Sequence, residues 1–326
     1  MPKQAGWAVR GALLALAVAS AGCAGGPRSS ASFERSLSVS GPLRLELANG
    51  SGSAQISAGD AGQVRIRGEV RARGWVPGDV RRRVEEIASN PPIERQGNLI
   101  RVGSGRTRDL MRSMTLNYTI VVPPETELET EVGSGSVEVR DIHGPAKLTT
   151  GSGGISVANL REDAQVATGS GGITLSNVAG EIRATTGSGG ITLSQIRGEI
   201  RATTGSGGIS IAEPGGRVTA GTGSGSVTVS GAAADLRAKT GSGNLTIEGN
   251  PLPDSYWELH TGSGGIAIAV PASASFRFHA HSNSGQIETH IPVVIEERSK
   301  HELRARVGSG AARVEAETGS GNIQIR

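Results

Sequence analysis

The triplet Gly-Ser-Gly returns at a constant interval through the middle of the chain, and this interval limits the folds open to it. Seven triplets begin 18 residues apart, from Gly133 to Gly241. A fixed period below about 50 residues is typical of solenoids and related arrays, in which each repeat is one supersecondary unit. The triplet also occurs outside the regular run, at Gly50, at Gly262, as Asn283-Ser284-Gly285, at Gly308 and at Gly319.

Each repeat contains two segments in which apolar residues alternate. Counted from the first glycine, positions five and seven are aliphatic and position six is polar, as in Ile191, Thr192 and Leu193. Positions fourteen and sixteen are also apolar, as in Ile200 and Ala202. A period of two indicates a strand with one buried face. We therefore predict an all-β fold, a parallel β-solenoid whose 18-residue coils stack about 4.8 Å apart and align their aliphatic residues into a core.

The composition suits such a stack of thin layers. The 326 residues include 50 glycines, and only 2% are aromatic. Glycine tolerates a positive φ and a close backbone approach, so we expect the triplets at the corners of the coils. Acidic residues precede arginines by two positions, as in Glu181 with Arg183 and Glu199 with Arg201. Such rows of opposite charge offset the repulsion within each row, which favours a charge-paired outer surface.

Residues 42–132 differ from the regular repeats and are predicted to form a β cap over one open end of the stack. Alternating apolar residues predict strands near residues 43–47, 64–66, 99–101 and 116–122. Val80, Val84 and Ile87 share one helical face, so a short helix is expected from Pro77 to Ser89. The solenoid repeats are predicted for residues 133–326. The open ends of a solenoid need caps, and we expect the irregular repeats after Gly262 to cap the end opposite residues 42–132.

The N-terminus has the pattern of a bacterial export signal in residues 1–22. Lys3 and Arg10 precede an apolar stretch, Gly11 to Ala19, that is too short to span a bilayer, and small residues follow it. Cys23 follows Ser20-Ala21-Gly22, which resembles the lipobox of bacterial lipoproteins, although Ser20 stands where that pattern has an aliphatic residue. The alternative is ordinary cleavage after Ala17-Val18-Ala19. We predict lipidation of Cys23, with residues 23–41 as a flexible tether.

These features predict a location in the bacterial cell envelope, on the outer membrane or a periplasm-facing membrane. Two or more acyl chains on Cys23 would give stable anchoring to the membrane. Cys23 is the only cysteine, so an exported fold would have no intrachain disulfide. Removal of residues 1–22 leaves 31 basic against 30 acidic residues, and this near-neutral balance argues against nucleic acid as a partner.

The repeats resemble a known family. The segment GSGGITLSNVAGEIRATTGSGGITLSQIRGEIRATT, preceded by YTIVVPPETELETEVGSGSVEV, is similar to the bacterial putative-adhesin domain family, a domain of unknown function. The resemblance covers about residues 42–326. It implies an exported β-solenoid at the cell envelope and brings no catalytic or ligand residues with it.

The repeated triplet does not predict catalysis or cofactor binding. Its serines recur at every coil, whereas a nucleophile needs one activated position with a partnering base. The chain contains neither G-x-x-x-x-G-K-[ST] nor G-x-G-x-x-G, so these phosphate-binding loops are absent from the sequence. The triplet also lacks the aspartate of the calcium-binding nonapeptide. We therefore predict a protein that is not an enzyme and uses no cofactor.

Histidines in the lengthened coils are the candidate metal ligands. His260 and His281 fall at position seventeen of what we take as adjacent coils, and His279 falls at position fifteen, all facing outward. The same rows continue with Lys239 and Arg306, and no acidic or cysteine ligand completes a set. A solvated polar ladder is therefore the favoured interpretation, with no metal bound.

Two neighbouring aromatic residues have different predicted roles. Trp257 aligns with the inward Leu236 and Phe278, so we expect it in the core. Tyr256 aligns outward and is a candidate for surface contact with a partner.

The sequence favours an envelope surface module, an adhesin or a protein-interaction scaffold, whose partner is an envelope protein or a surface glycan. One alternative is a carbohydrate-active enzyme on a β-helix, which would need a concave groove with two unpaired carboxylates. Another is a partner in envelope-stress signalling. Flat, charge-neutral faces would favour the interaction module over the enzyme.

The register makes a prediction about two adjacent residues. Ile191→Asp would bury an unpaired charge and should lower the free energy of unfolding by about 3 kcal/mol or more. Thr192→Asp changes an outward position and should have a small effect. Urea denaturation of the two variants measures the difference, and similar losses would refute the register.

Overall fold

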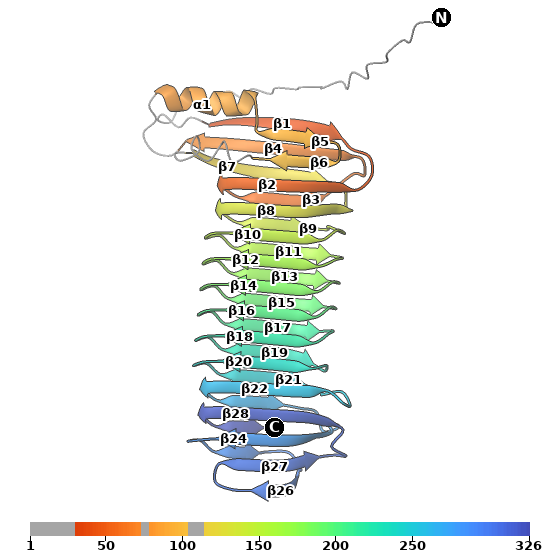
Figure 1. Ribbon diagram of the computed structural model, residues 1–326, viewed down its shortest axis with the longest axis vertical. Coiled ribbons are helices and arrows are strands. Elements are labelled where there is room, and N and C mark those ends of the chain that lie inside the picture. The colour runs from red at the N-terminus through yellow and green to blue at the C-terminus, as the bar shows by residue number, and fades with distance from the viewer. Residues whose placement is uncertain (1–29, 73–77, 104–113) are drawn as a thin grey trace, which may run out of the picture.

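The alternating segments form two strands in each repeat, and the strands stack into two long sheets with a thin core between them (Figure 1). The computed structural model describes residues 30–72, 78–103 and 114–326. Like positions of successive repeats pair in parallel, so that Ile173, Ile191 and Ile209 are direct neighbours across three strands. The predicted β-solenoid with 18-residue coils is confirmed.

Sheet A contains fourteen of the described strands. Their spatial order is β1 (Ser30–Ser38), β4 (Gln63–Ala72), β7 (Met114–Val122), β3 (Ala54–Ala58), β9 (Val137–Arg140), β11 (Ile155–Leu160), β13 (Ile173–Val178), β15 (Ile191–Ile196), β17 (Ile209–Pro214), β19 (Val227–Ala232), β21 (Leu245–Gly249), β23 (Ile266–Ala269), β29 (Ile323–Ile325) and β25 (Ile287–Thr289).

Sheet B contains fifteen of the described strands. Their spatial order, from the C-terminal end of the rod, is β26 (Val294–Arg298), β27 (Glu302–Val307), β24 (Phe276–Ser282), β28 (Ala312–Ser320), β22 (Tyr256–Ser263), β20 (Leu236–Thr240), β18 (Val218–Thr222), β16 (Ile200–Thr204), β14 (Ile182–Thr186), β12 (Ala164–Thr168), β10 (Ala146–Thr150), β8 (Thr126–Ser134), β2 (Leu43–Ser51), β6 (Leu99–Val102) and β5 (Ile93–Gln96).

The core consists of the inward aliphatic ladders of both sheets. Ile191 is 1% exposed, whereas Thr192 beside it is exposed, as the alternation predicted. Trp257 is fully buried in the core, and its indole Nε1 donates a 2.8 Å hydrogen bond to the carbonyl of Ala234. The indole therefore satisfies its one donor while its rings extend the aliphatic ladder.

A buried threonine precedes each of the six triplets from Gly151 to Gly241 and connects successive coils. Thr186 Oγ1 donates to the carbonyl of Gly171 at 2.9 Å and accepts the N–H of Gly189, which lies one coil later than Gly171, at 3.2 Å. The same pair of bonds is made by threonines in neighbouring coils, Thr150, Thr168, Thr204, Thr222 and Thr240. Each hydroxyl thus satisfies two backbone groups at the corner where the chain leaves sheet B.

The second glycine of each triplet in the regular repeats is required by a close approach between backbones. A Cβ added to Gly189 would lie 1.8 Å from the carbonyl oxygen of Gly171, one coil earlier. In the described repeats from Gly151 to Gly243, no triplet glycine has a positive φ. Glycine was expected at this corner for two reasons, a positive φ and a close backbone approach. Only the close backbone approach applies here.

The other corner of the coil does use left-handed backbone, and with residues other than glycine. Five successive coils place a residue with φ between 52° and 60° at position nine: Asp141, Asn159, Asn177, Gln195 and Glu213. Asparagine and aspartate adopt this conformation more readily than most other residues. This ladder of left-handed residues was not predicted from the sequence.

The N-terminal cap contains the expected helix and strands. Helix α1 (Gly78–Ser89) coincides with the predicted helix to within one residue and buries Val84 and Ile87. The strands predicted near residues 43, 64, 99 and 116 are β2, β4, β6 and β7. Strands β2 and β3 continue the parallel stack through β8 and β9, so the coil at Gly50 is a rung of the solenoid itself.

The predicted tether is wrong for part of its length, because β1 is a strand. Residues 30–38 pair antiparallel with β4, from Ser30 opposite Arg71 to Ser38 opposite Gln63. Phe33 is 5% exposed and lies over Gly68, where a Cβ would be 2.1 Å from the ring. The burial of Phe33 explains the strand, which the serine-rich composition concealed. Residues 1–22, Cys23 and the rest of the predicted tether up to residue 29 lie outside the described residues.

The C-terminal end departs from sequential stacking. Strand β28, from the last repeat, lies between β22 and β24, with Trp257 opposite Val314 and Val314 opposite Phe278. Strands β27 and β26 then close sheet B in antiparallel pairing. The triplet at Gly308 is a turn in which Gly308 and Gly310 have φ of 56° and 76°, and it is not a corner of a coil. Within the described residues, none of the helices has the length and apolar character needed to cross a membrane.

The threonine ladder gives a prediction with a matched control. Thr186→Val keeps the shape of the side chain but leaves the Gly189 N–H and the Gly171 carbonyl without this partner, so it should cost about 1–3 kcal/mol of stability. Thr185→Val makes the same chemical change at an exposed neighbour and should cost little. Urea denaturation measures both, and equal midpoints would contradict the proposed role of the buried hydroxyl.

Candidate functional site

The candidate residues of the lengthened coils lie together on the outer face of sheet B, near the C-terminal end of the rod. Tyr256 and His260 belong to β22, and His279 and His281 belong to β24. Strand β28 separates the two. All four side chains are partly exposed, as predicted.

The expectation that His260 and His281 lie in adjacent coils is wrong. In the actual register, Glu317 of β28 lies between them, opposite both histidines. His260 Nδ1 lies 3.3 Å from a Glu317 carboxylate oxygen, whereas His281 Nε2 lies 2.9 Å from the side-chain oxygen of Asn283. The sequence order suggests that β22 and β24 are neighbours, but β28 of the last repeat lies between them.

His279 belongs to a neighbouring row and has its own acidic partner. Its Nε2 lies 2.9 Å from an oxygen of Glu302, which also pairs with Arg304 at 2.9 Å. The hydrogen bond from His279, followed by the charge of Arg304, lowers the pKa of Glu302. Across the described ranges, no three histidine, cysteine or acidic side chains converge in a way that could hold a metal ion. The histidines thus take part in separate polar pairs.

Tyr256 is held in place by its neighbours on β28. Its hydroxyl donates a hydrogen bond to Glu315, and the guanidinium carbon of Arg313 lies 5.7 Å from the centre of its ring. Burial raises the pKa of Tyr256 to about 12, together with the bond to Glu315 and the charges of nearby glutamates. The residue is therefore a neutral, oriented phenol on a partly exposed surface.

Carboxylates on the face of sheet B pair with cations in rows that cross several strands. Glu258 receives hydrogen bonds from Lys239 and Arg237, at 2.5 Å and 2.6 Å, and the bond from Lys239 is the largest cause of its lowered pKa. Farther along, Arg201 pairs with Glu199 at 2.8 Å. The alternation of acids and bases predicted from the sequence is present here as ion pairs.

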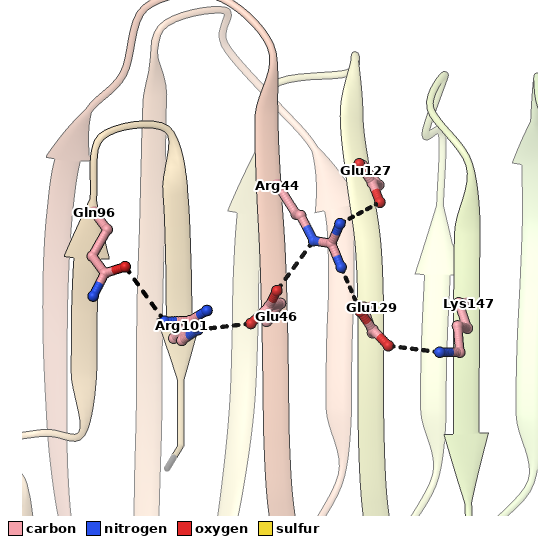
Figure 2. A network of polar contacts seen from close by, with 7 residues as sticks. All are labelled: Arg44, Glu46, Gln96, Arg101, Glu127, Glu129 and Lys147. Atoms are coloured by element: carbon pink, nitrogen blue, oxygen red, sulfur yellow. Dashed lines mark hydrogen bonds and ion pairs between the residues drawn. The ribbon is translucent and has the colours of Figure 1, made fainter.

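The largest such network joins the N-terminal cap to the regular coils. Figure 2 shows Arg44 on β2 in contact with Glu46, Glu127 and Glu129, at 3.1, 3.1 and 2.7 Å. Glu129 continues to Lys147 on β10 at 2.8 Å, and the hydrogen bond from Lys147 is the first cause of the lowered pKa of Glu129. Arg44 therefore contacts acids on its own strand and on β8, across the junction.

Among the hollows on the surface of the described residues, two are candidate sites. The first, of about 490 Å³, lies at the left-handed corner. Strands β9, β11, β13 and β15 end along this edge of the rod (Figure 1). The hollow is lined by Asp141, His143, Asn159, Leu160, Arg161, Asn177, Ala179 and Arg197. We call this hollow the corner groove. The second, of about 440 Å³, lies at the cap junction and includes Glu125, Glu127 and Glu162 in its lining.

Neither hollow has the pair of unpaired carboxylates that would favour a carbohydrate-cleaving enzyme. At the cap junction, Glu125 contacts His143 at 2.9 Å and Glu127 contacts Arg44 at 3.1 Å. The corner groove has one carboxylate, Asp141, which accepts a 2.7 Å hydrogen bond from Asn159. The corner groove was not predicted from the sequence, although the asparagines that recur at position nine were a signal for it.

Comparison with known proteins agrees with this architecture. Residues 124–230 and 217–326 match the model of the Toastrack family, DUF4097. The chain belongs to the Toastrack family. The resemblance seen in the repeats is thus confirmed as membership of a family of β-solenoid domains of unknown function.

A solved structure of low sequence identity is also similar to this Toastrack protein. The crystal structure of a putative cell adhesion protein from Clostridium sporogenes is 13% identical to it, with 90% of this chain and 99% of that chain covered and a TM-score of 0.25. No curated protein matches the sequence.

The ion pairs of Glu258 give a prediction about acid stability. Its pKa in the folded protein lies below the ordinary value of 4.5, so its contribution is present above that pH and is lost as the pH falls through the lower folded value. Between about pH 5 and pH 3, Glu258→Gln should therefore lose less stability than wild type does, and the difference should be about 1 kcal/mol or less. Glu248→Gln, at an exposed position of β21, is the control. Denaturant midpoints across this pH range measure the effect, and parallel curves for Glu258→Gln and wild type would contradict it.

Proposed function

We propose that this Toastrack protein is a non-enzymatic interaction module of the bacterial cell envelope, tethered to a membrane through a lipidated Cys23. Its partner is an envelope protein or a surface glycan, which it contacts along the outer faces of the solenoid. It requires no cofactor. Family membership supports an envelope module in general terms, and the arrangement of the rod supports the particular function.

The observation that carries the proposal is the position of the N-terminal strand. Strand β1 is the edge of sheet A at the capped end, and the lengthened coils lie at the opposite end (Figure 1). Seven residue steps separate Cys23 from Ser30, and a fully extended chain covers at most about 3.6 Å per step, or about 25 Å in all. An anchored Cys23 would keep the cap near the membrane, so the rest of the rod would project from it.

The outer faces suit reversible contact better than catalysis. Charged side chains on sheet B pair with one another, as Arg237 does with Glu258 and Arg304 with Glu302. Paired charges leave the face near neutral while keeping it polar, which is typical of the rim of a wet protein interface. Tyr256 adds an oriented aromatic ring on the same face, and we propose it as a contact residue.

The tether is tested by fatty-acid labelling in the producing cell. Wild-type protein should incorporate radiolabelled fatty acid and sediment with membranes, whereas Cys23→Ser should incorporate none, because the chain has no other cysteine to acylate. Ser20→Leu restores the aliphatic residue of the lipobox pattern and should label at least as well as wild type. Equal labelling of wild type and Cys23→Ser would refute the anchor, as would an unlabelled wild type whose mature chain begins after Ala19.

A further inference from the structure

The corner groove has a floor of side-chain amides in fixed orientations. Asn159 Nδ2 donates a 2.7 Å hydrogen bond to Asp141, and Asn177 Nδ2 donates a 2.8 Å hydrogen bond to the side-chain oxygen of Asn159. Asp141, Asn159 and Asn177 all have left-handed backbone, with φ of 60°, 58° and 52° respectively. Each amide nitrogen has a second N–H, and the oxygen of Asn177 is the free end of the chain of bonds. The floor therefore offers donors and an acceptor that are already oriented.

Two arginines line the groove above this floor. Arg161 and Arg197 occupy the same position of coils that are two steps apart, and the position between them is the small residue Ala179. Because neighbouring strands lie about 4.8 Å apart, the two residues are about 10 Å apart along the rod. Between them, Ala179 contributes only a methyl group.

In the part of the chain that the structure describes, neither of these two arginines has an acidic partner, a property that they share with Arg183 on the exposed face of β14. No ion pair within the described residues involves Arg161 or Arg197, whereas Arg201 contacts Glu199 at 2.8 Å and Arg217 contacts Asp235 at 3.0 Å. A guanidinium group is a planar fork of donors that matches a carboxylate in a bidentate pair. The groove thus presents two such forks that the protein itself does not occupy.

The groove is also bounded along the rod. In the next coil, Gly215 takes the position of Arg197 and contributes no side chain, so the row of basic residues ends there. At the other end the row reaches His143, which contacts Glu125 at 2.9 Å. The hollow therefore spans a few coils, which is the length of a short oligomeric ligand and not of a single ion.

We propose that the corner groove binds an acidic oligosaccharide, with two of its carboxylates on Arg161 and Arg197 and its hydroxyl groups on the asparagine floor. Hydroxyl groups both donate and accept, so they can use the amide N–H groups as well as the oxygens of Asp141 and Asn177. The lining has one aliphatic residue besides Ala179, namely the buried Leu160, so it offers little to the apolar side chains of a peptide. This site goes beyond the proposed function and does not depend on Cys23.

Calorimetric titration of the purified full-length protein tests the proposal. The probe is hexagalacturonate, and the comparison ligands are neutral maltohexaose, hexaglutamate and inorganic phosphate. Hexagalacturonate should bind, and the affinity should fall about tenfold or more in Arg161→Ala/Arg197→Ala, since each arginine contributes a charge-assisted pair. Arg161→Lys/Arg197→Lys keeps both charges but loses the bidentate geometry, so it should bind more weakly than wild type.

Two further variants separate the groove from general charge effects. Arg183→Ala removes the same charge from the exposed face of β14, outside the groove, and should bind as wild type does. Asn177→Asp puts a carboxylate into the floor without requiring a new backbone conformation, because Asp141 already adopts a positive φ, and it should weaken binding. Unchanged thermal denaturation of the variants would show that the coils remain folded.

Several outcomes would overturn the proposal. No binding of hexagalacturonate, or equal affinity of wild type and the double alanine variant, would exclude the site. Equal affinity for hexaglutamate would assign the groove to acidic peptides, and full competition by phosphate would reduce it to a simple anion site. An equal loss in Arg183→Ala would show attraction by total charge alone. Each of these results is independent of the fatty-acid labelling of Cys23, so failure of one proposal does not decide the other.

Discussion

The contact on which the whole rod depends is the close approach of successive backbones at the triplet corner. At that corner the chain of one coil lies directly on the carbonyl groups of the coil before it, with no room for a Cβ on Gly189. The preceding threonine, Thr186, satisfies the carbonyl and amide that this approach would otherwise leave buried without partners. The corner therefore fixes both the distance between coils and their register, and the aliphatic ladders follow from it.

The opposite corner has no such restriction, and its chemistry varies from coil to coil. Position nine requires a left-handed residue, yet Asp141, Asn159 and Gln195 all occupy it. Glutamine and asparagine differ in how readily they adopt this conformation, so the coil stack must compensate for local strain of order 1 kcal/mol. Variable side chains on an invariant backbone are the usual condition for a binding surface on a repeat protein. The corner groove lies at this variable corner.

Much of the fold could be predicted because the alternation of apolar residues in each repeat shows which side chains form the core. The alternation around Ile191 and Thr192 determines which residues face inward, and alignment of Trp257 with Leu236 was sufficient to place the indole. Strand β1 was missed because Phe33 is its only large buried residue in a serine-rich segment. The histidine pairing was missed for another reason. Sequential stacking is the natural assumption, and only the three-dimensional register shows that Glu317 separates His260 from His281.

The corner groove could not be predicted from hydropathy, because it depends on the positive φ at position nine and on arginines that have no acidic partner among the described residues. A positive φ at Asn159 does not change the alternation of apolar residues. The two-residue spacing that pairs Glu199 with Arg201 does not predict whether Arg197 has a partner. In a solenoid, a charge on a strand has neighbours one coil above and below it, so an acid and a base two residues apart can pair across coils. A charge at a corner whose neighbours are Ala179 and Gly215 has no such partner. Stacking that pairs Arg201 with Glu199 on the flat face therefore leaves Arg197 available at the corner, where a ligand can supply the missing carboxylate.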